Sequence, residues 1–189
     1  RDAYLAFSVF LAKLKCGHSY ANFYNQPKPI ANALFQQRDK VPFYFKWIDG
    51  KMFVVRNFSG EARLKAGTEI LSINGTPVAT ILAKLITVAR ADGSNDAKRA
   101  AYLEVLGTDR FEAFDVFFPL FFPLRSEKLN LTIRPFGSKN AVPATVDALT
   151  YERRLAAMPA AAGAEPDAPA LELTFPKANT AVLRMPGWA

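Results

Sequence analysis

Two hydrophobic periodicities alternate along this chain, one typical of helices and the other of strands. Near the start, Tyr, Phe and Leu recur at three- and four-residue spacing, which predicts an amphipathic helix over 1–15. From Val41 to Ile48, aromatic and β-branched residues predict a strand. Asp49-Gly50 then predicts a hairpin turn into a second strand over 52–58. The fold class expected from these patterns is α+β.

The stretch from Phe53 to Val78 has the order strand, loop, strand and tight turn, and the rest of the chain is organised around it. Its second strand is short and buried in character, with Ile70 and Ile73 among its apolar residues. Asn74-Gly75 supplies residues that tolerate positive φ at a turn. A helical run over 79–90 follows at once.

Three more segments follow in the middle of the chain. A second helix is predicted over 95–106, with Ser94 as its N-cap. Residues 111–124 are rich in Phe, a density more typical of a core or an interdomain contact than of an exposed lipid or peptide platform. Alternation over 129–134 predicts the final strand of this domain.

The last part of the chain is more extended. Residues 142–154 are predicted to be extended, and 156–170 contain mostly Ala, Pro and Gly, a composition typical of a linker. Two strands are predicted over 171–175 and 180–185. The longest apolar stretch is interrupted by Pro and is too short to span a membrane, so membrane insertion is not expected.

The central stretch resembles a known domain. A small-residue loop over 62–66 leads into Gly67-Thr68-Glu69-Ile70 and then Ile73-Asn74-Gly75. These runs resemble the Gly-Asp-x-Ile and Ile-Asn-Gly runs of PDZ domains in bacterial proteases, although the acid stands one position later here. The resemblance implies a PDZ-like, partly open β-barrel with two helices.

Charge and cysteine content exclude several classes of function. The net charge is +7, but Lys and Arg are scattered singly, without a basic block or a nucleic-acid-binding motif. Nucleic-acid binding is therefore not expected. One Cys and one His cannot by themselves furnish a closed zinc site, so neither a metal nor another cofactor is expected.

Candidate chemistry is concentrated in Cys16-Gly17-His18-Ser19-Tyr20, directly after the first predicted helix. An imidazole titrates near neutral pH, so His18 is a candidate general base. The alternative is a structural His that hydrogen-bonds to a nearby carbonyl. Cys16 and Ser19 lack the surroundings of a nucleophile, since neighbours in sequence rarely face each other and no nucleophile elbow is present.

Four runs together carry a wider resemblance that covers nearly the whole chain. They are the Cys-Gly-His-Ser-Tyr run, Ala-Arg-Ala-Asp-Gly-Ser-Asn-Asp-Ala-Lys-Arg (89–99), Phe-Asp-Val-Phe-Phe-Pro (114–119) and Leu-Arg-Met-Pro-Gly-Trp (183–188). They resemble the front half of tail-specific (C-terminal processing) and tricorn-related serine peptidases. In the tricorn branch, a His at the matching place activates a Ser of a later α/β core, although Gly17 stands where tricorn has Ser. Other branches use a Ser-Lys dyad, in which case His18 is structural.

The resemblance implies three parts: an N-terminal helical segment over 1–40, a PDZ-like domain over 41–136, and strands with an Ala/Pro-rich linker over 137–189 that lead to a protease core absent from this chain. The expected function is that of the N-terminal portion of a serine-type peptidase acting on peptides or protein tails, inactive as this fragment. The alternative is a non-catalytic PDZ-like module that binds peptides as an added strand. A third interpretation is a small-molecule carrier resembling the retinoid-binding repeats. By the habit of the peptidase family, the protein is expected in the periplasm or outside the cell.

Overall fold

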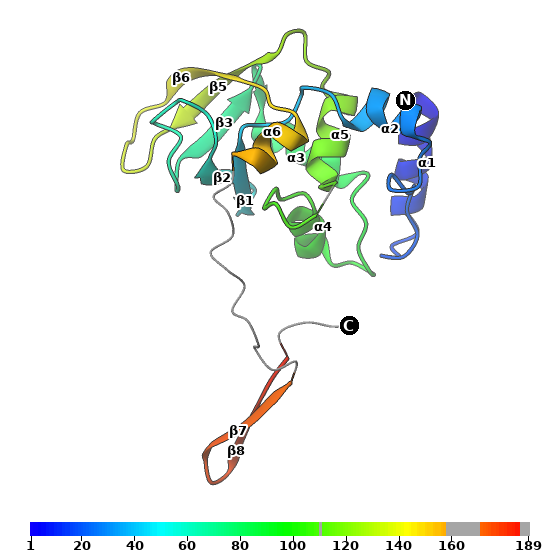
Figure 1. Ribbon diagram of the computed structural model, residues 1–189, viewed down its shortest axis with the longest axis vertical. Helices are drawn as coiled ribbons and strands as arrows, with labels where there is room; N and C mark the ends of the chain where they lie inside the picture. The colour runs from blue at the N-terminus through cyan, green and yellow to red at the C-terminus, as the bar shows by residue number, and fades with distance from the viewer. Residues whose placement is uncertain (110, 158–170, 186–189) are drawn as a thin grey trace. The chain divides into compact units, whose positions relative to one another are not determined.

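The computed structural model describes residues 1–109, 111–157 and 171–185 (Figure 1). The chain divides into two units, Arg1–Ala157 and Met158–Ala189, and each is described by itself. Most of the predicted linker over 156–170, and Trp188, lie outside the described residues. The predicted division into three parts stays a prediction.

The first unit is built on a six-stranded antiparallel sheet with the order β1-β2-β3-β5-β6, in which β4 pairs with β3. The strands are β1 (Phe43–Ile48), β2 (Lys51–Asn57), β3 (Glu69–Ile73), β4 (Thr76–Pro77), β5 (Lys128–Arg134) and β6 (Val142–Asp147). The predicted hairpin turn is confirmed, because Asp49 and Gly50 both have positive φ, at 49° and 72°. Such a pair of residues gives a turn whose twist matches that of the flanking strands.

The sheet curls so that its two ends approach each other. Lys40, just before β1, pairs with Leu149, just after β6, through two backbone hydrogen bonds of 2.9 Å. Alternating side chains of β1, β2 and β5 face the interior, where Phe45, Met52 and Leu129 are fully buried. The predicted α+β class with a partly open barrel is confirmed.

Six helices are described in the first unit. They are α1 (Asp2–Ala12), α2 (Lys28–Phe35), α3 (Val78–Ile86), α4 (Asp96–Tyr102), α5 (Ala113–Phe121) and α6 (Tyr151–Ala156). Figure 1 shows α5 between the sheet and the pair α1 and α2. The ring of Tyr4 in α1 stacks on Phe117 of α5 at a centroid distance of 6.0 Å.

The N-cap predicted for α4 was wrong by one residue. Asn95 is the cap, since its side-chain oxygen accepts a hydrogen bond of 2.9 Å from the backbone N–H of Lys98. An Asn side chain can satisfy one of the free N–H groups of the first turn as well as Ser can. The Ser94 hydroxyl instead accepts a hydrogen bond of 3.1 Å from the Lys15 ammonium.

The Phe-rich run forms α5, and its predicted burial is confirmed: every residue from Phe111 to Leu120 is buried. The prediction that 142–154 is extended was wrong in its second half. The chain is extended only through β6, and Thr150 then caps α6 by accepting a hydrogen bond of 3.2 Å from the Arg153 backbone N–H. A threonine cap of this kind starts a helix where strand pairing ends.

A buried ionic cluster ties α6 to α5. Arg154 is 1% exposed, and its guanidinium donates two hydrogen bonds to the Asp115 carboxylate and one of 3.2 Å to the carbonyl of Val41. The Glu112 carboxylate lies 3.5 Å from the same guanidinium. Burial raises the pKa of Glu112. Two acids therefore depend on one buried cation for compensation.

The second unit contains a hairpin of β7 (Glu172–Lys177) and β8 (Thr180–Arg184), as predicted from the sequence. Three of its apolar side chains, Leu173, Phe175 and Leu183, are more than half exposed. A two-stranded hairpin has no partner layer of its own to bury such residues. Among the described residues of both units, no helix has the length and apolar character needed to cross a membrane.

Candidate functional site

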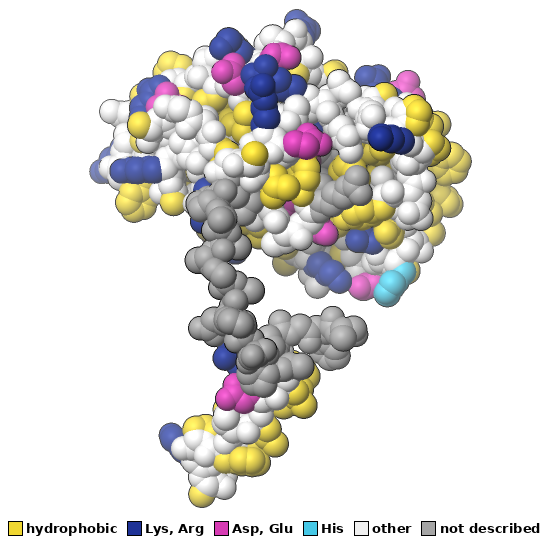
Figure 2. All heavy atoms as spheres, in the orientation of Figure 1, with side chains coloured by type: hydrophobic (Ala, Val, Ile, Leu, Met, Phe, Trp, Pro, Cys, Tyr) yellow, Lys and Arg dark blue, Asp and Glu magenta, His cyan; other side chains and the backbone are white. Residues whose placement is uncertain are grey.

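The loop that carries His18 follows α1 and is fastened to the segment after α3. The backbone N–H of Gly93 donates a hydrogen bond of 2.8 Å to the carbonyl of Lys15. The N–H of Gly17 donates one of 2.7 Å to Oδ1 of Asp92, which lies 75 residues away in sequence. His18 itself is exposed, and Figure 2 shows the single histidine, coloured cyan, at the surface.

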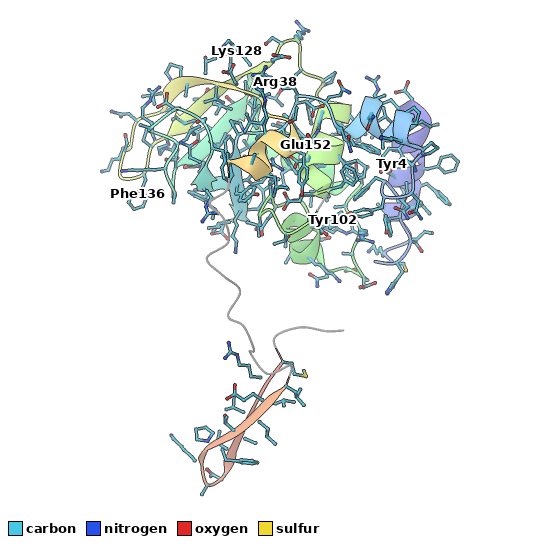
Figure 3. The ribbon with its side chains drawn as sticks, viewed as in Figure 1. Tyr4, Arg38, Tyr102, Lys128, Phe136 and Glu152 are labelled. Carbon is cyan, nitrogen blue, oxygen red and sulfur yellow. The ribbon has the colours of Figure 1, made fainter. Side chains whose placement is uncertain are left out.

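Arg90 contacts the same loop through its guanidinium group. Its guanidinium donates a hydrogen bond of 3.2 Å to the Gly17 carbonyl and lies 3.9 Å from the centre of the Tyr20 ring. The ring of Tyr102 is 5.2 Å from the guanidinium on another side. Figure 3 shows Tyr102 on α4 and Tyr4 on α1. Burial raises the pKa of Tyr102 to about 12, so the Tyr102 hydroxyl stays neutral. The loop is held by cation–π contacts as well as hydrogen bonds.

These contacts bring Asp92, which is distant in sequence, close to Cys16 and His18. One ligand-type atom from each of Cys16, His18 and Asp92 lies within 4.8 Å of the other two. The N–H of Gly17 lowers the pKa of Asp92 first, and the Lys98 ammonium, 3.3 Å from Oδ2, lowers it further. Asp92 is therefore an anion beside the imidazole. An adjacent carboxylate is the usual group that orients a histidine base.

Sequence reasoning selected His18 and set Cys16 aside as a nucleophile, and Asp92 entered only as part of the run over 89–99. The available signal was the Ala-Arg-Ala-Asp-Gly run, whose Arg90 and Asp92 both contact Gly17. The role of His18 as a general base stays a prediction. The structure adds a nearby carboxylate, Asp92, whose two oxygens accept hydrogen bonds from the Gly17 N–H and the Lys98 ammonium.

The outer edge of β1 is covered by the segment that follows α4. Phe45 exchanges two backbone hydrogen bonds with Val105, of 2.9 and 3.3 Å. The backbone N–H of Trp47 donates a hydrogen bond of 3.1 Å to the Glu104 carboxylate, and its indole donates one of 3.0 Å to the carbonyl of Leu103. Residues 103–105 thus occupy the hydrogen-bonding positions that an added strand would use.

Helix α5 contacts β1 through an interior side chain. The ring of Phe114 meets that of Phe45 edge-on at 4.8 Å and stacks on Phe118 at 4.9 Å. Helix α5 also contacts α3. The Glu112 carboxylate at the start of α5 accepts hydrogen bonds of 2.7 and 2.8 Å from the N–H groups of Leu106 and Gly107. The space beside β1 is therefore filled by the chain's own segment over 103–107. Backbone hydrogen bonds to Phe45 hold Val105 in place, and hydrogen bonds to Glu112 hold Leu106 and Gly107.

Comparison with known proteins gives one family and one solved structure. The family profile described as a PDZ domain matches residues 37–148. The crystal structure of mature CPAF is similar over 57% of this chain and 19% of that chain, with 21% identity and a TM-score of 0.34. The matched part of this chain thus spans about a fifth of the length of that protein. No curated protein sequence matches the chain.

Proposed function

This chain belongs to the PDZ domain family, and on that premise we propose that it is the PDZ-containing portion of a serine-type peptidase in which His18 acts as the general base. The proposed substrates are peptides or protein tails. The serine nucleophile would come from residues outside these 189. The four runs that resemble those of tail-specific and tricorn-related peptidases support this proposal.

The observation that carries the proposal is the placement of His18. It is an exposed imidazole on a loop fixed by three backbone contacts, and it has an ionised carboxylate, Asp92, within 4.8 Å. A general base needs access to a substrate-bound nucleophile, a fixed position and a group that orients its ring. A purely structural histidine would not require exposure.

The test uses the longest natural protein that contains this chain and a serine-directed fluorophosphonate probe. We expect labelling of the wild type and a fall of about 10²- to 10⁴-fold in the labelling rate of His18→Ala, the usual contribution of a general base. Lys13→Ala is the matched control, since Lys13 is exposed just before the same loop and its replacement should leave labelling unchanged.

Each outcome of the labelling experiment has a defined meaning. Undiminished labelling of His18→Ala would keep the serine peptidase and remove His18 from its mechanism, in favour of a Ser-Lys dyad. Absence of labelling in the folded wild type would overturn the peptidase proposal. The PDZ domain would then be left as a binding module.

Peptide binding by the PDZ domain is the second candidate, favoured by family membership alone. Strand addition at β1 would have to displace residues 103–105, so the apparent affinity is lower than the intrinsic affinity by the fraction of chains in which that edge is open. We expect Glu104→Ala, which removes the acceptor for the Trp47 N–H, to bind a library of C-terminal peptides more tightly than the wild type does. Equal affinity in the two proteins would show that peptides do not use this edge.

A further inference from the structure

The cluster beside Gly17 contains the donor atoms of a metal site. Sulfur from Cys16, nitrogen from His18 and oxygen from Asp92 lie within 4.8 Å of one another, at or near the surface. We propose that these three residues bind a zinc ion, with water completing a tetrahedral set. Three protein ligands and one water form the common arrangement of an open zinc site.

The donor set selects the metal. Thiolate and imidazole are ligands of Zn²⁺ and its neighbours, whereas Mg²⁺ and Ca²⁺ require several oxygen ligands. Within the described residues, Asp92 is the acid that completes the set with the single Cys and the single His. Counting Cys and His in the sequence found only two ligands, because the third comes from the segment after α3.

A backbone contact already holds Asp92 beside the loop that carries the other two proposed ligands, Cys16 and His18. The N–H of Gly17 holds Oδ1 of Asp92 at 2.7 Å, which leaves Oδ2 as the oxygen for the metal. A Cβ atom added to Gly17 would lie 3.0 Å from both carboxylate oxygens, so this approach suits glycine.

One cation competes for the same oxygen. The Lys98 ammonium lies 3.3 Å from Oδ2 of Asp92, but its side chain is 56% exposed and can turn to solvent when the ion enters. The other cations nearby have partners of their own. Lys15 donates to the Ser94 hydroxyl, and Arg90 donates to the Gly17 carbonyl.

The metal proposal is independent of the peptidase proposal, although the two share His18. A zinc ion would occupy the imidazole lone pair that a general base needs, so bound zinc would inhibit the proposed peptidase. Metal binding by the 189-residue chain can be measured without any activity. Failure of one proposal therefore leaves the other standing.

The test is a titration of the reduced 189-residue chain with Co²⁺, followed by displacement with Zn²⁺. We expect visible d–d absorption of a tetrahedral site and a near-ultraviolet thiolate-to-cobalt charge-transfer band, both abolished by one equivalent of Zn²⁺. Cys16→Ser should lose the charge-transfer band. Asp92→Asn should weaken binding at least about tenfold, the lower end of what loss of a supporting group costs a metal site.

Two further variants make the assignment sharper. Lys98→Met should tighten binding severalfold, because it removes the ammonium that competes for Asp92. Asp96→Asn is the matched control, since Asp96 is 80% exposed on the same segment and its loss changes the net charge equally. A wild-type chain without the charge-transfer band would overturn the proposal. Equal effects of Asp92→Asn and Asp96→Asn would overturn the role of Asp92.

Discussion

Arg154→Met is expected to lower the free energy of unfolding of the chain by about 3–5 kcal/mol, the usual cost of removing one partner from a buried ion pair. Arg154 is 1% exposed and is the cation that lies against both Asp115 and Glu112. Methionine fills most of the volume but removes the cation that both buried acids contact, and Glu112 keeps only its two hydrogen bonds from backbone N–H groups. Urea denaturation followed by tryptophan fluorescence measures the loss.

The neighbouring residue provides the control. Arg153 lies on the same helix but is exposed, so Arg153→Met should change stability by less than about 0.5 kcal/mol. Adding Asp115→Asn to Arg154→Met should recover part of the loss, because one uncompensated charge is then gone. Similar losses for the two arginine variants would show that the ionic cluster does not hold α6 to α5.

Gly107→Ala is expected to destabilise the chain by about 2–5 kcal/mol, combining the cost of a left-handed backbone with that of overpacking. Gly107 has a φ of 76°, and an added Cβ would lie 2.5 Å from Cζ of Tyr44. Tyr44 is 5% exposed, and its ring packs edge-on against Phe58, so it has little room to move. The chain must then shift where residues 103–107 run beside β1.

Gly50→Ala separates the two contributions to this loss. Gly50 has nearly the same φ, 72°, but an added Cβ would meet no atom within 4 Å. Only the backbone cost of about 1–2 kcal/mol is expected there. The difference between the two variants in denaturant midpoint measures the contact with Tyr44, and equal losses would refute it.

Local features of this fold followed from the sequence because short-range rules govern them. The β1–β2 turn was predicted from Asp49-Gly50, whose residue types tolerate positive φ. A helix over 1–15 was also predicted and α1 forms there, but its predicted apolar face was wrong, because Phe7, Phe10 and Leu14 are more than half exposed and the buried residues of α1 are Ser8 and Ala12. Caps and boundaries were less certain. Ser94 and Asn95 can each cap a helix, and only their partners in space decide between them.

The burial of the Phe-rich run was also predicted, but not the surface it covers. Hydrophobic density indicates that a segment leaves water; it does not indicate its partner. The contact of Phe114 with Phe45, and the pairing of Trp47 with Glu104 at a separation of 57 residues, became visible only in the tertiary structure. The Trp47–Glu104 hydrogen bond, with the pairing of Phe45 and Val105, shows that the edge of β1 is already occupied.

The sequence by itself determined the α+β class, the PDZ-type runs and His18 as the candidate base. Tertiary structure alone placed Asp92 beside Cys16 and His18, across 75 residues of chain from Gly17. The physical reason is that periodicity and turn residues express interactions within a few positions. A site assembled from two distant loops depends on how the whole core packs.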